Sequence, residues 1–79
     1  MLSSMNYKLD LHGVRHIDVR SKVIRFIEDL WGKGVNVEII TGNSNEMKKL
    51  VIEVLEEYKL EYFDGGIFGI NNAVITTTI

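Results

Sequence analysis

The chain contains no cysteine among its 79 residues, which excludes disulfide bonds and thiolate metal sites. No apolar run approaches the roughly 18 residues that a membrane-spanning helix needs. The opening segment Met1-Leu2-Ser3-Ser4-Met5 is too short and too uncharged for a signal peptide. We therefore predict a cytoplasmic protein with no membrane partner. Hydrophobic residues make up 46% of the chain and charged residues 25%, which is typical of a soluble globular domain.

A chain of 79 residues has room for one core between two layers and none for a second domain. We predict a single domain over residues 1–79. The packed core should lie within residues 7–79, and residues 1–6 should form a loose N-terminal segment.

Basic residues are scarce in the second half, and none follows Lys59. Residues 1–34 carry six basic and four acidic side chains, whereas residues 35–79 carry three and seven, for a net charge of −2. This balance argues against indiscriminate binding to polyanions, so any surface for nucleic acid must be local. Its available cations are Arg15, Arg20, Lys22, Lys48 and Lys49. Taken singly, each is better explained as a solvated helix residue.

Hydrophobic periodicity predicts the order of helices and strands. Residues 7–12 alternate between apolar and polar, as in a half-buried strand that directs Lys8, Asp10 and His12 to one face. Helical spacing follows over residues 16–32, and residues 35–40 form a second apolar strand. The next helix starts after residue 44, and strands at 60–63 and 73–79 complete the chain.

The second helix has the clearest periodic pattern, with apolar residues on a single stripe from Met47 to Tyr58. This phase predicts that Leu50 and Val54 face the sheet. Asn43 or Ser44 would cap the start of the helix, and Asn43 with Glu46 has the spacing of a capping box.

The predicted fold is α/β, a two-layer βαβαββ sandwich with a four-stranded mixed sheet. Right-handed crossovers would place both helices on one face and make the first three strands parallel. A tight final connection would make the last strand antiparallel. The carboxyl ends of the first three strands then share one edge, rimmed by loops 12–16, 41–44 and 64–72, and ligands bind at such edges.

Leu9-Asp10-Leu11-His12-Gly13 is the first candidate motif at that edge. A strand would turn Asp10 and His12 to the same side, where a histidine beside a carboxylate can act as a general base. The same pair could bind a divalent ion, although two ligands do not complete a metal site. The alternative is an exposed strand face that has no chemical role. His16 is either a further ligand or a turn residue.

Thr41-Gly42-Asn43-Ser44 is the second candidate motif, at the handover from a strand to a helix. Free backbone amides and the positive end of the helix dipole can hold a phosphate there, with Ser44 and Lys48 as further donors. The alternative is that these residues only form the turn and cap the helix. Phe68 lies in the glycine-rich loop 65–69, and Tyr62 precedes that loop. Either ring could stack on a base, or Phe68 could instead close the core.

Together these two motifs resemble those of the small MutS-related (Smr) domain family, which has an L-D-L-H-G strand end and a later glycine turn. The resemblance runs from about Leu9 to the C-terminus. Many Smr domains have H-G-K-G where this chain has Thr41-Gly42-Asn43-Ser44. The resemblance implies a stand-alone Smr domain with a fold similar to the C-terminal domain of translation initiation factor three. It also implies a link of Asp10 and His12 to nuclease activity.

These residues lead to one main hypothesis and two alternatives. The main hypothesis is a DNA or RNA endonuclease, with Asp10 and His12 catalytic and Mg²⁺ or Mn²⁺ as the metals the pair would take. The alternatives are a noncatalytic nucleic-acid-binding module and a protein-interaction domain. The sequence does not indicate the oligomeric state. Residues expected to contact nucleic acid or phosphate are Gly13, Arg15, Thr41, Gly42, Asn43, Ser44 and Lys48.

Overall fold

The computed structural model describes residues 7–65 and 73–79 of the chain. The elements in these ranges follow the predicted βαβαββ order. They are β1 (Tyr7–Asp10), α1 (His16–Leu30), β2 (Asn36–Ile40), α2 (Asn45–Glu57), β3 (Tyr62–Asp64) and β4 (Val74–Thr78).

The strands form one mixed sheet in the order β1-β2-β4-β3. β1 pairs with β2 in parallel, whereas β4 is antiparallel to both of its neighbours, β2 and β3. β1, β2 and β3 therefore run in the same direction, as predicted, although β4 separates β3 from the other two. Their carboxyl ends lie at one edge of the sheet.

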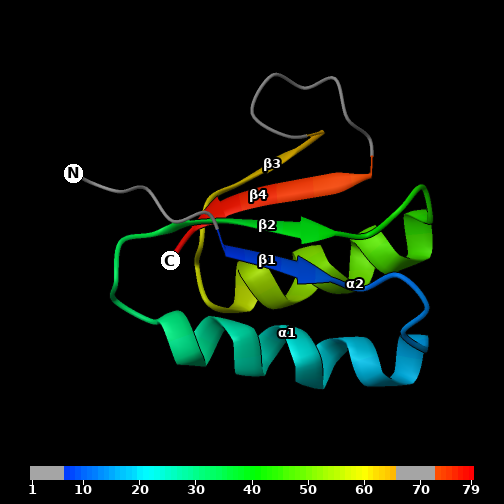
Figure 1. Cartoon of the computed structure of the whole chain (residues 1–79), viewed down its shortest axis with the longest axis horizontal. Helices are drawn as coiled ribbons and strands as arrows, with labels where there is room; N and C mark the ends of the chain where they lie inside the picture. The colour runs from blue at the N-terminus through cyan, green and yellow to red at the C-terminus, as the bar shows by residue number, and fades with distance from the viewer. Residues whose placement is uncertain (1–6, 66–72) are drawn as a thin grey trace.

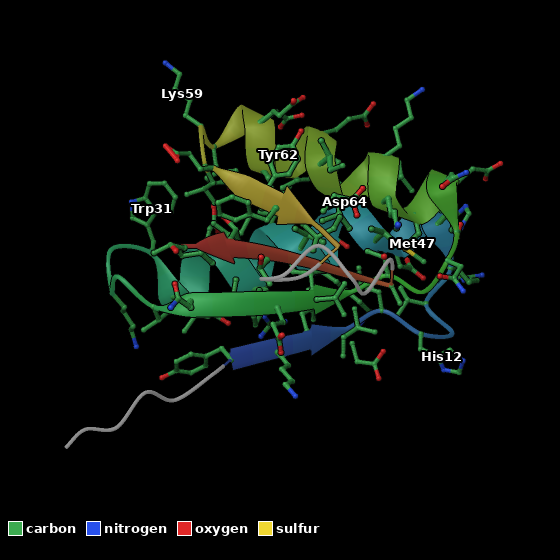
Figure 2. The ribbon with its side chains drawn as sticks, turned by 90° about the horizontal axis from the view of Figure 1, so that it is seen from above. His12, Trp31, Met47, Lys59, Tyr62 and Asp64 are labelled. Atoms are coloured by element: carbon green, nitrogen blue, oxygen red, sulfur yellow. The ribbon has the colours of Figure 1, made fainter. Side chains whose placement is uncertain are left out.

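Both helices cover the same face of the sheet (Figure 1). This confirms the predicted α/β two-layer sandwich with a four-stranded mixed sheet. Figure 2 looks onto the other face, which we call the far face. Neither helix of the described residues combines the length and apolar character needed to cross a bilayer. The fully buried core side chains between the layers are Leu11, Val19, Val23, Ile27, Val37, Ile39, Val51, Val54, Leu55 and Ile75.

The start of α2 is capped by Ser44, one of the two residues predicted for this role. Its hydroxyl accepts a hydrogen bond from the amide of Met47 at 3.2 Å. Such a cap contributes about 0.5–2 kcal/mol. The predicted Asn43 capping box is therefore absent, because the helix begins one residue later than that box requires.

The turn at the C-terminus of α2 makes the next strand begin later in the sequence than predicted. The amides of Lys59 and Leu60 donate to the carbonyls of Glu56 and Leu55, and Lys59 has a φ of 58°. These bonds form a Schellman motif, with a lysine at the left-handed position where glycine is usual. β3 therefore starts at Tyr62 instead of the predicted residue 60.

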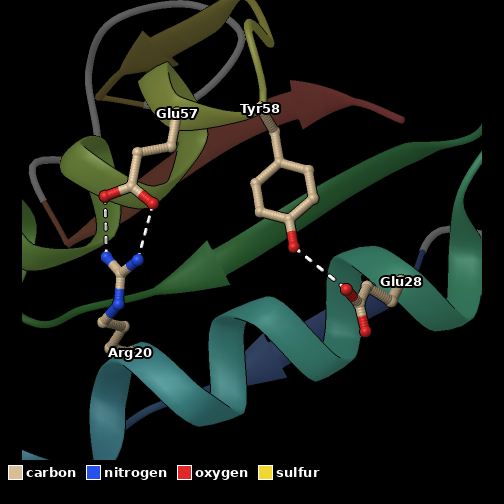
Figure 3. A network of polar contacts seen from close by, with 4 residues as sticks. All are labelled: Arg20, Glu28, Glu57 and Tyr58. Atoms are coloured by element: carbon tan, nitrogen blue, oxygen red, sulfur yellow. Dashed lines mark hydrogen bonds and ion pairs between the residues drawn. The ribbon is translucent and has the colours of Figure 1, made fainter.

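Polar contacts join the two helices on their exposed sides (Figure 3). The guanidinium of Arg20 donates two hydrogen bonds, of 2.8 and 2.6 Å, to the carboxylate of Glu57. Tyr58 donates to Glu28 at 3.1 Å, and its ring lies 5.6 Å from that of Trp31. Trp31 is 55% exposed, so it packs on the outside of the helices.

The pairing of Arg20 with Glu57 predicts a pH-dependent contribution to stability. Hydrogen bonding from Arg20 lowers the pKa of Glu57 below its ordinary value of 4.5. A carboxyl with a lowered pKa in the folded state stabilises the protein above its unfolded pKa, and this stabilisation is lost as the pH falls through the folded pKa. Urea unfolding should therefore show Arg20→Gln to be less stable than the parent chain near neutral pH. The difference should shrink below a pH of about 4.5, and a difference that stays constant with pH would contradict the assignment.

Candidate functional site

The two sequence motifs meet at one end of the sheet, where β1 and β2 end and both helices begin (Figure 1). We call this region, residues 11–16 and 41–46, the motif edge. The amide of Leu11 donates to the carbonyl of Ile40 at 3.0 Å, which extends the parallel pairing by one residue. Nδ1 of His16 lies 3.3 Å from a carboxylate oxygen of Glu46, so the starts of α1 and α2 are also in contact.

The first motif forms a tight turn directly after β1. The amide of Val14 donates to the carbonyl of Leu11 at 3.0 Å, and Gly13 has a φ of +79°. A side chain at Gly13 would be strained by that backbone conformation even though the space beside it is open. His12 precedes this glycine, and its exposed side chain points outward from the end of the sheet (Figure 2).

Asp10 has a different partner from the one expected. Its carboxylate accepts a hydrogen bond of 2.9 Å from the backbone amide of His12. An aspartate that bonds the backbone two residues ahead favours a turn over a continued strand. β1 therefore ends at Asp10, and His12 lies in the turn instead of beside Asp10 on one strand face. Asp10 holds the backbone that presents the imidazole.

The second motif begins with a residue that is buried and internally bonded. Thr41 is 5% exposed, and its hydroxyl lies 2.9 Å from the carbonyl of Gly42 and 3.3 Å from that of Ala73. The amides of Thr41 and Gly42 both donate to the carbonyl of Ala73, at 2.8 and 3.1 Å. These groups attach the turn to the start of β4, so they are not available to a phosphate in this conformation.

The rest of the second motif faces solvent. Gly42 has a φ of +69°, which allows the chain to turn before the exposed residues Asn43 and Ser44. Ser44 uses its side chain as the helix cap. The first amides of α2, at Asn45 and Glu46, have no partner inside the helix, as at any helix start. These amides and the side chain of Asn43 are the donors that this turn can offer to an anion.

The two candidate cations have different surroundings. The side chain of Lys48 is only 13% exposed and its ammonium lies 3.4 Å from a carboxylate oxygen of Asp64, at the end of β3. Its charge is thus already paired on the helix-covered side of the sheet. Arg15, the residue that precedes α1, is 80% exposed and lies 3.3 Å from Asp18. Arg15 is therefore the more accessible of the two.

The histidine and carboxylate side chains near the motif edge do not form a preorganised metal site. Among residues 7–65 and 73–79, no three histidine, aspartate or glutamate side chains are placed to hold one metal ion. Asp10 and His12 remain the predicted pair, but the Asp10 carboxylate is engaged by a backbone amide.

Several contacts at or near the motif edge were not predicted from the sequence. Glu46 reaches His16, Asp64 pairs with Lys48, and the carbonyl of Ala73 anchors the second turn. Each joins residues distant in sequence, so no local pattern signals them. The third predicted rim, residues 64–72, lies mostly outside the described residues, and so does Phe68. Tyr62, the other predicted stacking residue, points toward α2, where its hydroxyl lies 3.4 Å from Glu56.

The family model of the Smr domain matches residues 9–64, which is more than half of the 79-residue chain. The chain therefore belongs to the Smr domain family, a nucleic-acid-associated, nuclease-like family. The match includes both motif turns and ends at the last residue of β3. Comparison with curated proteins and comparison with solved structures found no match.

Proposed function

We propose that this Smr domain is an endonuclease that binds DNA or RNA at the motif edge and hydrolyses a phosphodiester bond there. The observation that carries the proposal is the convergence of the two motif turns. The hydrogen bond from the amide of Leu11 to the carbonyl of Ile40 holds the ends of β1 and β2 together, beside the start of α2. A histidine, an arginine and the first amides of α2 thereby lie at the same edge of the sheet.

In the proposed reaction, the imidazole of His12 accepts a proton from a water molecule as the water oxygen attacks phosphorus. The phosphorus–oxygen ester bond then breaks, the leaving oxygen takes up a proton from solvent, and the imidazolium of His12 releases its proton to solvent. Asp10 is a positioning residue in this scheme, because its carboxylate fixes the backbone of His12. Arg15 and the first amides of α2 stabilise the negative charge that develops on the phosphate.

The proposal is tested by incubating the purified protein with supercoiled plasmid and with structured RNA, each with and without Mg²⁺ or Mn²⁺. Nicked plasmid or discrete RNA fragments are the expected products. Binding without cleavage of either substrate under any of these conditions would favour the noncatalytic binding module.

The noncatalytic alternative is favoured by the second turn. Thr41 and the amide of Gly42 are bonded within the protein, and Lys48 is paired with Asp64. The phosphate group would therefore be held by fewer donors than the sequence suggested, which weakens stabilisation of a transition state more than simple binding. A domain without affinity for nucleic acid would instead favour the protein-interaction alternative.

Arg15→Ala should weaken nucleic-acid binding and reduce its dependence on salt. One phosphate contact fewer releases one counterion fewer, so the slope of log affinity against log salt concentration should fall by about 0.7–0.9. Fluorescence anisotropy with a labelled oligonucleotide over a range of salt concentrations measures this slope. Lys22→Ala is the control, because Lys22 is an exposed cation on α1 outside the motif edge. An unchanged slope for Arg15→Ala would remove Arg15 from the interface.

A further inference from the structure

The far face of the sheet has a cleft at the end remote from the motif edge. Its volume is about 380 Å³, within the range of small-ligand pockets. The start of β2, the end of β4 and the segment leading into β3 surround it. The lining residues are Asn36, Lys59, Leu60, Glu61, Phe63, Thr76, Thr77 and Thr78.

Phe63 forms an exposed aromatic wall of this cleft. Tyr62 reaches Glu56 of α2, and alternation along β3 therefore directs Phe63 to the far face. Phe63 pairs in register with Thr76 of β4 and is 65% exposed, although large apolar side chains usually avoid water. An exposed phenyl ring beside a cleft provides a stacking surface for a flat aromatic ligand.

Hydrogen-bonding groups line the floor and rim beside this ring. Thr76 is 7% exposed, and its buried hydroxyl has no hydrogen-bond partner within the protein. A buried hydroxyl without a partner is destabilising. Because Thr76 lines the cleft, rotation about its first side-chain torsion can bring the hydroxyl toward a ligand. At the rim, Thr78 donates to the side-chain oxygen of Asn36 at 2.7 Å, which leaves the Asn36 amide group able to donate.

The cleft has little charge to attract a phosphate. Its two ionisable side chains, Lys59 and Glu61, have opposite signs, and Lys59 points away from the sheet (Figure 2). An aromatic wall with hydroxyl and amide groups suits a flat, uncharged ligand that has hydrogen-bonding groups at its edge. A nucleobase has this chemistry, and it can enter such a cleft only when it is unpaired.

We propose that the cleft binds an unpaired nucleobase, so that the nucleic acid bound at the motif edge contains a single-stranded segment. This inference rests on the proposed function, because that proposal supplies the nucleic acid whose base would enter the cleft. β2 runs from the cleft at Asn36 to Ile40, the residue that precedes the motif edge. A strand rises about 3.3 Å per residue, so the four steps from Asn36 to Ile40 span about 13 Å. That distance corresponds to about four nucleotides at the roughly 3.4 Å spacing of a stacked strand.

The experiment compares the affinities of variants for a labelled single-stranded oligothymidylate by fluorescence anisotropy. Phe63→Ala should lower the affinity by about 5–100-fold, and Phe63→Tyr should retain it because the stacking ring is kept. Trp31→Ala is the control, since Trp31 is another exposed aromatic residue but packs against Tyr58 on the helix side. Thr76→Val, which removes the unpartnered hydroxyl, should weaken binding and also raise the urea midpoint.

A second measurement uses uridine, a nucleoside without phosphate that does not need the motif edge. Titration followed by NMR should shift the backbone amide signals of Phe63, Thr76 and Thr78. If neither Phe63→Ala nor uridine has an effect while Arg15→Ala still weakens oligonucleotide binding, this inference is overturned and the proposed interface stands. If uridine shifts those signals but no cleavage is found, the nucleobase site stands and the nuclease proposal fails.

Discussion

Replacement of His12 by alanine is expected to lower phosphodiester cleavage by about 10²–10⁴-fold, the usual contribution of a general acid or base. The imidazole is exposed on the turn after β1 and adds little to the core, so folding should be unchanged. Oligonucleotide affinity should change little, because Arg15 and the start of α2 provide the proposed phosphate contacts. Rates of plasmid nicking and RNA cleavage at equal enzyme concentration measure the effect.

His16→Ala is the matched control for this variant. His16 lies at the same edge but is bonded to Glu46, and no chemical role is proposed for it. Its removal should leave most of the cleavage intact. Equal cleavage by the parent chain and by His12→Ala would point to other residues or to a contaminating nuclease.

Leu55→Ala is expected to lower the free energy of unfolding by about 2–5 kcal/mol, through lost burial and the cavity that remains. The side chain of Leu55 is completely buried between α2 and the sheet. A core of this size supplies only about 3–5 kcal/mol of net stability, so the variant should lose a large part of it. Urea or thermal unfolding followed by circular dichroism measures the loss.

Leu50→Ala is the comparison for Leu55, because both lie on α2 and have the same chemistry. The sequence predicted that Leu50 faces the sheet, whereas the structure leaves it half-buried at the margin of the core. Its replacement should therefore cost clearly less than that of Leu55. A loss for Leu50→Ala equal to that for Leu55→Ala would mean that the helix is rotated about its axis.

Asp10 and Thr41 should affect different properties of the protein, although both contribute to the backbone of the motif turns. Asp10 should influence cleavage through the backbone of His12 and not through direct contact with its ring. The Thr41 hydroxyl should influence stability more than binding, since the turn uses it to bond the carbonyls of Gly42 and Ala73. The second turn thus combines a structural role at its start with exposed donors at its end.

Local patterns in the chain were sufficient to predict the order of elements, the two-layer architecture and the edge that joins both motifs. Periods of two and 3.6 residues record which side of a strand or helix is buried, and crossover handedness then decides the layers. The Leu9–Gly13 motif also indicated the family that the match over residues 9–64 confirmed.

Only the folded chain decided which polar groups are free. Asp10 bonds a backbone amide, Thr41 bonds the carbonyl of Ala73, and Lys48 pairs with Asp64. The partners of Thr41 and Lys48 come from segments distant in sequence, so no local spacing can reveal them. The same holds for the cleft beside Phe63, because its walls come from three strands that become neighbours only through the order β1-β2-β4-β3. Periodicity reports burial along one element, whereas hydrogen-bond partners and cavities depend on how several elements pack together.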